Sequence, residues 1–267
     1  MKKSVSVVAA VVILGGIVAA YFYSQHQRQP EPVQAQAPPP AAPPAAPAPV
    51  VRQVIETVPA QPPLPVLSES DKFMLDTLAD LVGNRSLMQF FHTERIIRNI
   101  VATIDNLPRN RAPLGVMPVK PAHGGFIAKD SGDDKTIGPE NAARYAPYVR
   151  IAEAIDARKL VEVYVRLYPL FQQAYEELGY PEGYFNDRLL VALDDLLAAP
   201  DLKEPVKLVQ PKVFYQFADP GLEARSAGQK ILMRIGGKNG AIIKAKLREI
   251  NRQVMLHMHD KKVEIGK

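Results

Sequence analysis

Residues 156–178, DARKLVEVYVRLYPLFQQAYEEL, contain the clearest periodic pattern in the chain. Their apolar residues recur every three or four positions, as they do on one face of an α-helix. These residues are Leu160, Tyr164, Leu167, Tyr168, Phe171, Tyr175 and Leu178. Asp156 is a typical N-cap residue and Gly179 is typical of a helix end. The pattern therefore predicts an amphipathic helix over 157–178, and it decides the fold class.

Similar segments on both sides of this helix predict further helices. They span 71–82, 94–107, 139–155, 184–198, 220–235 and 241–258, with a short one around 85–91. Capping residues stand at most of their starts, such as Thr93 before 94–107, and Gly or Pro follows most of their ends. We therefore predict an all-α domain of six to eight helices over residues 67–267.

Two segments of this domain lack the helical period. Residues 109–138 are rich in Pro and Gly and predict a long surface loop, with a short hairpin around 126–137. Residues 205–217, PVKLVQPKVFYQF, have extended character. Their two prolines argue against a central strand, because proline has no N–H to donate to a sheet.

The N-terminal 23 residues predict a membrane anchor. Lys2 and Lys3 precede an uncharged and mostly apolar run over 4–23, and a helix needs about 20 such residues to cross a bilayer. The positive-inside rule then places the N-terminus in the cytoplasm and the rest of the chain in the periplasm. We expect a single-pass inner-membrane protein. Cleavage before Tyr21, as in a secretion signal, is the alternative.

Residues 24–66 contain 13 of the 25 prolines in the chain. Proline fixes φ and lacks a backbone donor, so we expect a Pro/Ala-rich, disordered linker that extends as polyproline II and forms neither helix nor sheet. At ~3.1 Å per residue this linker would reach ~130 Å. Its predicted role is to hold the domain at a distance from the inner membrane.

Charge is unevenly distributed, although the net charge is only +5. Residues 68–224 contain 18 Lys and Arg against 23 Asp and Glu, whereas residues 225–267 contain 11 against 3. Lys244, Arg248 and Arg252 are spaced by four on the predicted last helix, so their charges align. We expect an envelope protein or an anionic cell-wall or lipid component to bind there. A solvated helix face is the alternative reading.

Tyr164, Tyr168 and Tyr175 are a second candidate binding set. They share one face of the helix 157–178 and could line a groove that stacks a peptide or a sugar. Tyrosines at this spacing more often belong to a core, with their hydroxyl groups bonded at its edge. Both interpretations stay open at this point.

Known catalytic and metal-binding patterns are not found. The chain contains no HExxH, GxSxG or SxxK pattern. His257 and His259 are two residues apart, so on a helix they point to nearly opposite sides and cannot share a metal. The chain has no cysteine, which excludes disulfides and thiolate sites. We predict no catalytic residue, no metal and no cofactor.

Four stretches resemble the bacterial "domain of unknown function 3014" family. They are IVATIDNLPR, RLYPLFQQAYEELGYPEGYFNDRL, VKLVQPKVFYQFADPGLEARSAGQKILMRIG and NGAIIKAKLREI. The resemblance covers roughly residues 68–252 and implies a single-anchor envelope protein with an Ala/Pro-rich spacer. The family label implies no activity, so no site residue is transferred.

These observations predict a non-enzymatic binding or scaffold protein of the cell envelope. One alternative is a peptidoglycan hydrolase or its regulator, because Glu69-Ser70 matches a dipeptide of helical enzymes that cut peptidoglycan. Another is a periplasm-spanning transducer. Nucleic acid is not an expected partner, because the predicted topology exports the domain. Gly16 and Ala20 would allow two anchors to pack closely, so a homodimer formed through the anchor is a further alternative.

Overall fold

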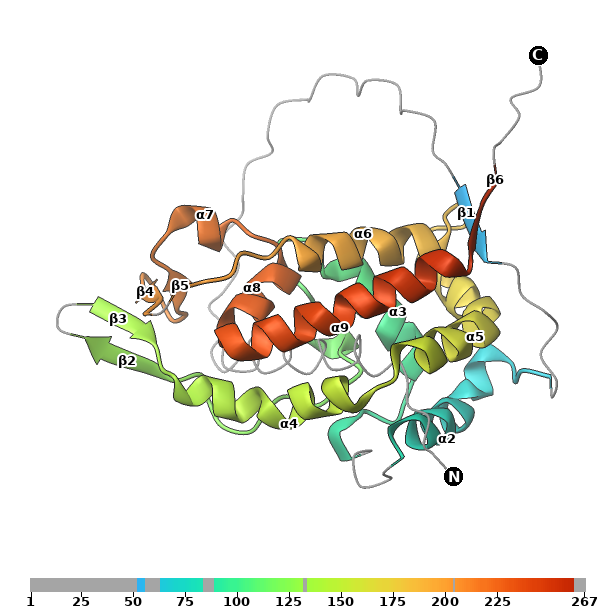
Figure 1. The fold of residues 1–267 in the computed structure, drawn as a ribbon, viewed down its shortest axis with the longest axis horizontal. Helices are drawn as coiled ribbons and strands as arrows, with labels where there is room; N and C mark the ends of the chain where they lie inside the picture. Colours follow the sequence, from blue (N-terminus) through green and yellow to red (C-terminus); the bar gives the residue numbers. More distant parts are fainter. Residues whose placement is uncertain (1–51, 56–62, 84–88, 132–133, 204, 262–267) are drawn as a thin grey trace, which may run out of the picture.

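The computed structural model is shown in Figure 1. It describes residues 52–55, 63–83, 89–131, 134–203 and 205–261. The predicted anchor and most of the predicted linker lie outside these residues. None of the described helices is long and apolar enough to cross a bilayer.

Eight α-helices occur in the described part of the chain. They are α2 (Ser70–Val82), α3 (Ile96–Asn106), α4 (Glu140–Ala154), α5 (Ala157–Glu177), α6 (Phe185–Leu197), α7 (Pro220–Glu223), α8 (Ala227–Arg234) and α9 (Gly237–Leu256), with 3-10 turns η1 (Leu67–Glu69) and η3 (Leu114–Val116). The helix predicted over 157–178 is confirmed as α5. Asp156 caps it, because its side chain accepts a hydrogen bond from Lys159 N at 3.1 Å.

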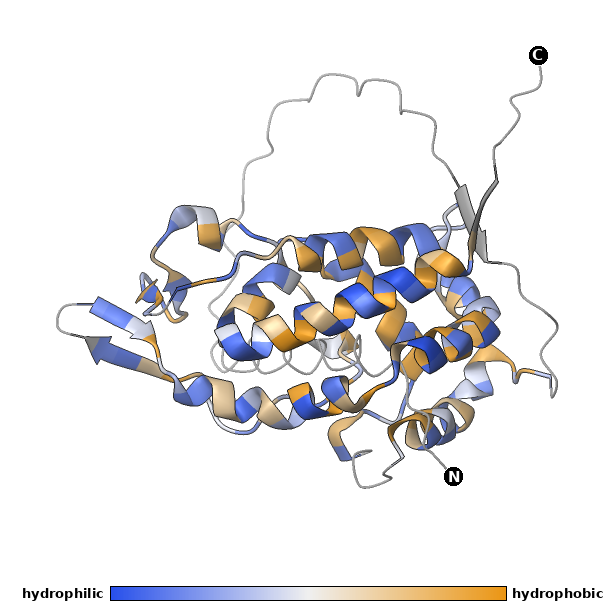
Figure 2. Cartoon of the chain, viewed as in Figure 1, coloured by the Kyte–Doolittle hydropathy of each residue, from blue (hydrophilic) through white to orange (hydrophobic). Residues whose placement is uncertain are grey.

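The helices pack around one large hydrophobic core. α9 packs against α4, α5 and α6, and α3 packs against α5 and α6. In Figure 1, α9 runs across the face of the molecule between α6 and α4. Phe171 of α5 and Phe185 of α6 stack inside this core with their ring centroids 5.7 Å apart. Figure 2 shows hydrophobic and hydrophilic residues alternating along these helices, as the amphipathic patterns predict.

A small antiparallel sheet extends from one end of the helical body (Figure 1). Its strands are β2 (Ala128–Ser131), β3 (Asp134–Ile137), β4 (Lys207–Val209) and β5 (Gln216–Phe217), in the order β2-β3-β4-β5. The strands β2 and β3 confirm the predicted hairpin. The domain is mostly helical but not purely all-α, so the all-α prediction is wrong in this respect. A second, smaller hydrophobic cluster that includes Val206, Leu208 and Phe217 stabilises the sheet.

The strand β4 is central in this sheet, contrary to the prediction from its prolines. It pairs with β3 on one side and with β5 on the other. Pro205 and Pro211 lie just outside its three residues. They therefore remove no donor from the ladder, and the restriction on proline in a sheet does not apply.

A separate two-stranded ladder joins the two ends of the described chain. β1 (Arg52–Ile55) pairs antiparallel with β6 (Met258–Lys261), with Ile55 opposite Met258. Residues 52–55 were expected to belong to a linker without sheet, and this expectation is wrong. The segment RQVI has no proline and two β-branched residues, so it can pair. Residue 258 was expected to end a helix, but α9 ends at Leu256.

The start of α3 also differs from the prediction. Thr93 is not its N-cap. The cap is Arg95, which has a left-handed φ of 50°. The Asp71 carboxylate on α2 accepts hydrogen bonds from Arg95 N at 2.7 Å and from Ile96 N at 2.8 Å. A capping group that comes from another helix is not visible in the local sequence.

The C-terminal helices differ from the predicted ranges in their boundaries. The predicted helix 220–235 is two helices, α7 and α8, each with its own N-cap at Asp219 and Ser226. The sequence GGKNG was expected to be a turn before a helix from residue 241. Instead, α9 begins at Gly237, and the turn contains Gly236 with a φ of 93°. That conformation is readily adopted only by glycine.

Candidate functional site

The tyrosine face of α5, defined by Tyr164, Tyr168 and Tyr175, is buried. The Tyr164 hydroxyl donates to Asn186 Oδ1, and the Tyr168 hydroxyl donates to Gln172 Oε1 at 3.0 Å. Burial raises the pKa of all three tyrosines. The core interpretation is therefore confirmed, and the prediction of a stacking groove is wrong. The rings of α6 and α5 fill the space that such a groove would need.

The aligned cations of α9 are separated by the fold. Lys244 is buried, so its predicted place on an exposed basic stripe is wrong. Its ammonium donates to the Ala199 carbonyl and to Asp201 Oδ1, the latter at 2.6 Å. This hydrogen bond to Lys244 is the main cause that lowers the pKa of Asp201 below its ordinary value. Lys244 therefore connects α9 to the segment after α6.

Arg248 and Arg252 are exposed, as the sequence predicts. Neither forms a hydrogen bond or a contact ion pair with any residue that the structure describes, although Arg248 is near enough to Asp201 to help lower the pKa of that carboxyl. Met255 and Leu256 follow on the same helix with 49% and 69% of their surfaces exposed. We call these four residues the basic end of α9. Unpaired guanidinium groups beside exposed apolar side chains are typical of a surface that binds a partner.

A cluster around Asp105 was not predicted. Asp105 on α3 is buried, and it is bound by Arg109 Nη2 at 2.8 Å and by Arg188 Nε of α6 at 2.9 Å. Arg109 also donates to the Tyr180 hydroxyl at 2.6 Å. The signal was present in the sequence, because Asp105 follows Val101 by four residues on the apolar face of α3. A carboxylate on such a face needs cationic partners.

The Asp105 cluster is structural in character. Two guanidinium groups occupy its carboxylate oxygens, so these oxygens are not free to contact a substrate. Tyr180 stacks on Tyr175 with a centroid distance of 4.6 Å, which closes the cluster on another side. The cluster therefore joins α3, α6 and the loop after α5 and presents no open reaction site.

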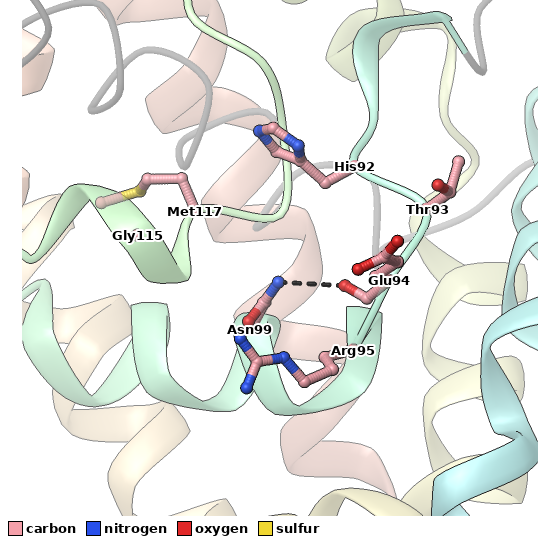
Figure 3. Close-up of a pocket in the computed structure, with 7 residues that line it drawn as sticks. All are labelled: His92, Thr93, Glu94, Arg95, Asn99, Gly115 and Met117. Atoms are coloured by element: carbon pink, nitrogen blue, oxygen red, sulfur yellow. Dashed lines mark hydrogen bonds between the residues drawn. The ribbon is translucent and has the colours of Figure 1, made fainter.

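A cavity of about 370 Å³ lies beside the start of α3. Figure 3 shows the side chains that surround it. His92, Thr93, Glu94 and Arg95 come from the segment before α3, Asn99 comes from α3, and Met117 follows η3. His92 and Met117 face Asn99 and Arg95 across the open space, and Glu94 lies opposite Met117. This cavity was not predicted, because Gly115 and Met117 come close to residues 92–99 only after the loop 109–120 folds back.

The described residues contain no candidate metal centre. No group of three or more His, Asp or Glu side chains there is placed to hold a metal ion. His257 lies just after α9 and His259 lies in β6, so these two residues do not share a helix. Helical spacing therefore does not describe how these two side chains are placed.

The comparison with known proteins gives a single assignment. No curated protein and no solved structure matches the chain. Residues 96–251 match the family described as "Protein of unknown function (DUF3014)". This range begins at α3 and ends within α9, so it contains the Asp105 cluster, the tyrosine face and Arg248. It is narrower at its N-terminal end than the resemblance over 68–252. The chain therefore belongs to the DUF3014 family.

Proposed function

We propose that this chain is a single-anchor inner-membrane protein whose helical domain lies in the periplasm and binds a partner there, without an enzymatic activity. The positive N-terminus and the apolar run over 4–23 support the anchor and its orientation. The proline-rich residues 24–66 support a spacer between the membrane and the domain. A domain held in this way is suited to reach a target away from its own anchor.

The basic end of α9 carries the proposal. Arg248 and Arg252 lie one helical turn apart, are exposed, and have no ion-pair partner among the described residues. An acidic partner would supply the missing carboxylates and would bury Met255 and Leu256 at the same time. Arginine is enriched in protein interfaces because it binds carboxylates, and methionine is enriched because its apolar side chain is buried there. We propose that the partner is an acidic protein of the cell envelope.

A peptidoglycan hydrolase has less support from the geometry. Such an enzyme needs a carboxylic acid with a raised pKa in an open cleft. Asp105 is the one fully buried carboxylate among the described residues, and it is bound by two arginines. Burial raises the pKa of the half-buried Asp195, but its carboxylate accepts hydrogen bonds from Ser226 and Gln229 and so joins α6 to α8. Glu69 is exposed at the start of α2, and Glu177 pairs with Arg98 at 2.8 Å on the surface.

Photocrosslinking in cells tests the proposal. Ala245 is exposed on α9, three residues before Arg248 and seven before Arg252, so it lies on the same face. A photoreactive amino acid at position 245 should form an adduct with a single acidic envelope protein, identified by mass spectrometry. The same amino acid at Ala224, which is exposed after α7, is the matched control.

The adduct at position 245 should disappear when Arg248 and Arg252 are both changed to Glu. Equal adducts at 245 and 224, or an adduct that survives the double change, would contradict the proposed docking surface. Recovery of only peptidoglycan fragments would instead favour a cell-wall target.

A further inference from the structure

The cavity beside α3 is lined by polar and charged side chains that have no partner among the described residues. The side chains of His92, Glu94 and Arg95 form no hydrogen bond or ion pair with any described residue. Arg98, three residues further along on α3, is by contrast paired with Glu177. Opposite charges that line one cavity and do not neutralise each other are available to a ligand.

The walls of this cavity are held by hydrogen bonds to main-chain carbonyl groups. His92 N donates to Pro118 O at 3.0 Å, and Lys120 N donates to Phe90 O at 2.8 Å. Thr103 Oγ1 of α3 donates to Val116 O at 2.9 Å, which fixes the wall that contains Met117. These contacts hold the loop against α3 before any ligand arrives. A preformed site loses less conformational entropy on binding.

The backbone at Arg95 is strained. Arg95 is the one non-glycine residue with positive φ in the described ranges, at 50°. Such a conformation is unfavourable for a long side chain, and Asn or Gly adopts it more readily. Asp71 already caps the first N–H groups of α3, so the helix itself does not require an arginine here. Arg95 is exposed and lines the cavity, so its guanidinium is accessible to a ligand there.

We propose that this cavity binds a small zwitterion the size of an amino acid or a dipeptide. The ligand carboxylate accepts hydrogen bonds from the Arg95 guanidinium and the Asn99 amide. The ligand ammonium group pairs with the Glu94 carboxylate. Asn99 Nδ2 now donates to Glu94 O at 3.2 Å, so its second N–H is available for the ligand. Met117 supplies an apolar wall for the ligand side chain.

The volume and the chemistry agree with this class of ligand. Small-molecule sites in proteins are typically ~300–1,000 Å³, and this cavity is about 370 Å³. Arginine is favoured for binding carboxylates, because its planar group can donate two parallel hydrogen bonds. This site is formed by other elements than the basic end of α9 and does not depend on the proposed function.

Ligand-observed NMR on the full chain in detergent tests the proposal with three probes. These are L-alanyl-L-alanine, its N-acetyl form and its C-terminal amide, so that the blocked forms each lack one charge. We expect the zwitterion to bind more tightly than either blocked form. Arg95→Asn and Glu94→Gln should each weaken its binding by about tenfold or more, the loss expected for one charge-assisted hydrogen bond.

Two controls separate binding from folding. Arg95→Asn should leave the unfolding midpoint unchanged or raise it, because Asn tolerates the positive φ. Arg150→Asn removes an exposed cation on α4 and should leave zwitterion binding unchanged. The proposal is overturned if no saturable binding occurs, if both blocked forms bind as tightly as the zwitterion, or if inorganic phosphate binds equally well with the same dependence on Arg95.

Discussion

The helices α5 and α9 have nearly the same length, 21 and 20 residues, and they pack against each other, yet they present different chemistry to solvent. The tyrosine face of α5 lies against α6, so its aromatic rings are buried in the core. α9 packs on α4, α5 and α6 through its apolar stripe and leaves Arg248 and Arg252 exposed. Regular spacing alone therefore does not identify a binding surface. The packing of the neighbouring helices decides which face stays exposed.

The largest effect is expected at the tyrosine face. Tyr164→Ala removes a buried ring and leaves the Asn186 amide oxygen without its donor. Truncating a buried aromatic residue typically costs about 3–5 kcal/mol in the free energy of unfolding. Urea unfolding of the domain, followed by circular dichroism, measures this loss. A loss as small as that of an exposed residue would mean that α5 is not a core helix.

An intermediate effect is expected at Lys244. Lys244→Ala leaves the buried Ala199 carbonyl without its donor, and such a loss costs about 1–3 kcal/mol. Arg252→Ala on the same helix is the matched control and should change stability by less than about 0.5 kcal/mol, because it removes no described contact. Equal effects of the two substitutions would contradict the buried position of Lys244.

The pH dependence of this difference sharpens the test. Because Lys244 lowers the pKa of Asp201 below its ordinary value of 3.8, the ion pair stabilises the fold at pH values above that value. Its contribution is lost as the pH falls through the lowered pKa and Asp201 takes up a proton. The stability gap between the wild type and Lys244→Ala should therefore narrow in acid. A gap that widens below pH 4 would contradict this assignment.

Much of the helical body follows from local sequence, and the departures have identifiable causes. The cap at Asp156, the apolar stripe of α5 and the hairpin β2–β3 all depend on residues close together in the chain. The cap that Asp71 provides for α3 depends on residues 24 or more positions apart. The pairing of β1 with β6 joins segments from opposite ends of the described chain. Local periodicity contains no information about such contacts.

The candidate sites show the same limit. The exposure of Arg248 and Arg252 follows from their position on the polar face of the predicted helix, and no distant residue changes it. Lys244 has the same spacing, but Asp201 and the Ala199 carbonyl turn it into a buried residue. The cavity beside α3 forms only where Met117 lies near Asn99. The path of the loop after α3 sets this approach, and the local sequence pattern does not predict that path.

The most direct test of the proposed binding surface is charge reversal at the basic end of α9. The partner identified by crosslinking should bind the wild-type domain in a salt-dependent way. Arg248→Glu with Arg252→Glu should abolish this binding, while stability changes by less than about 0.5 kcal/mol per substitution. The control variant, Arg111→Glu with Lys212→Glu, carries the same charge change at two exposed positions outside α9 and should bind normally. Unchanged affinity and salt dependence in the α9 variant would contradict the account.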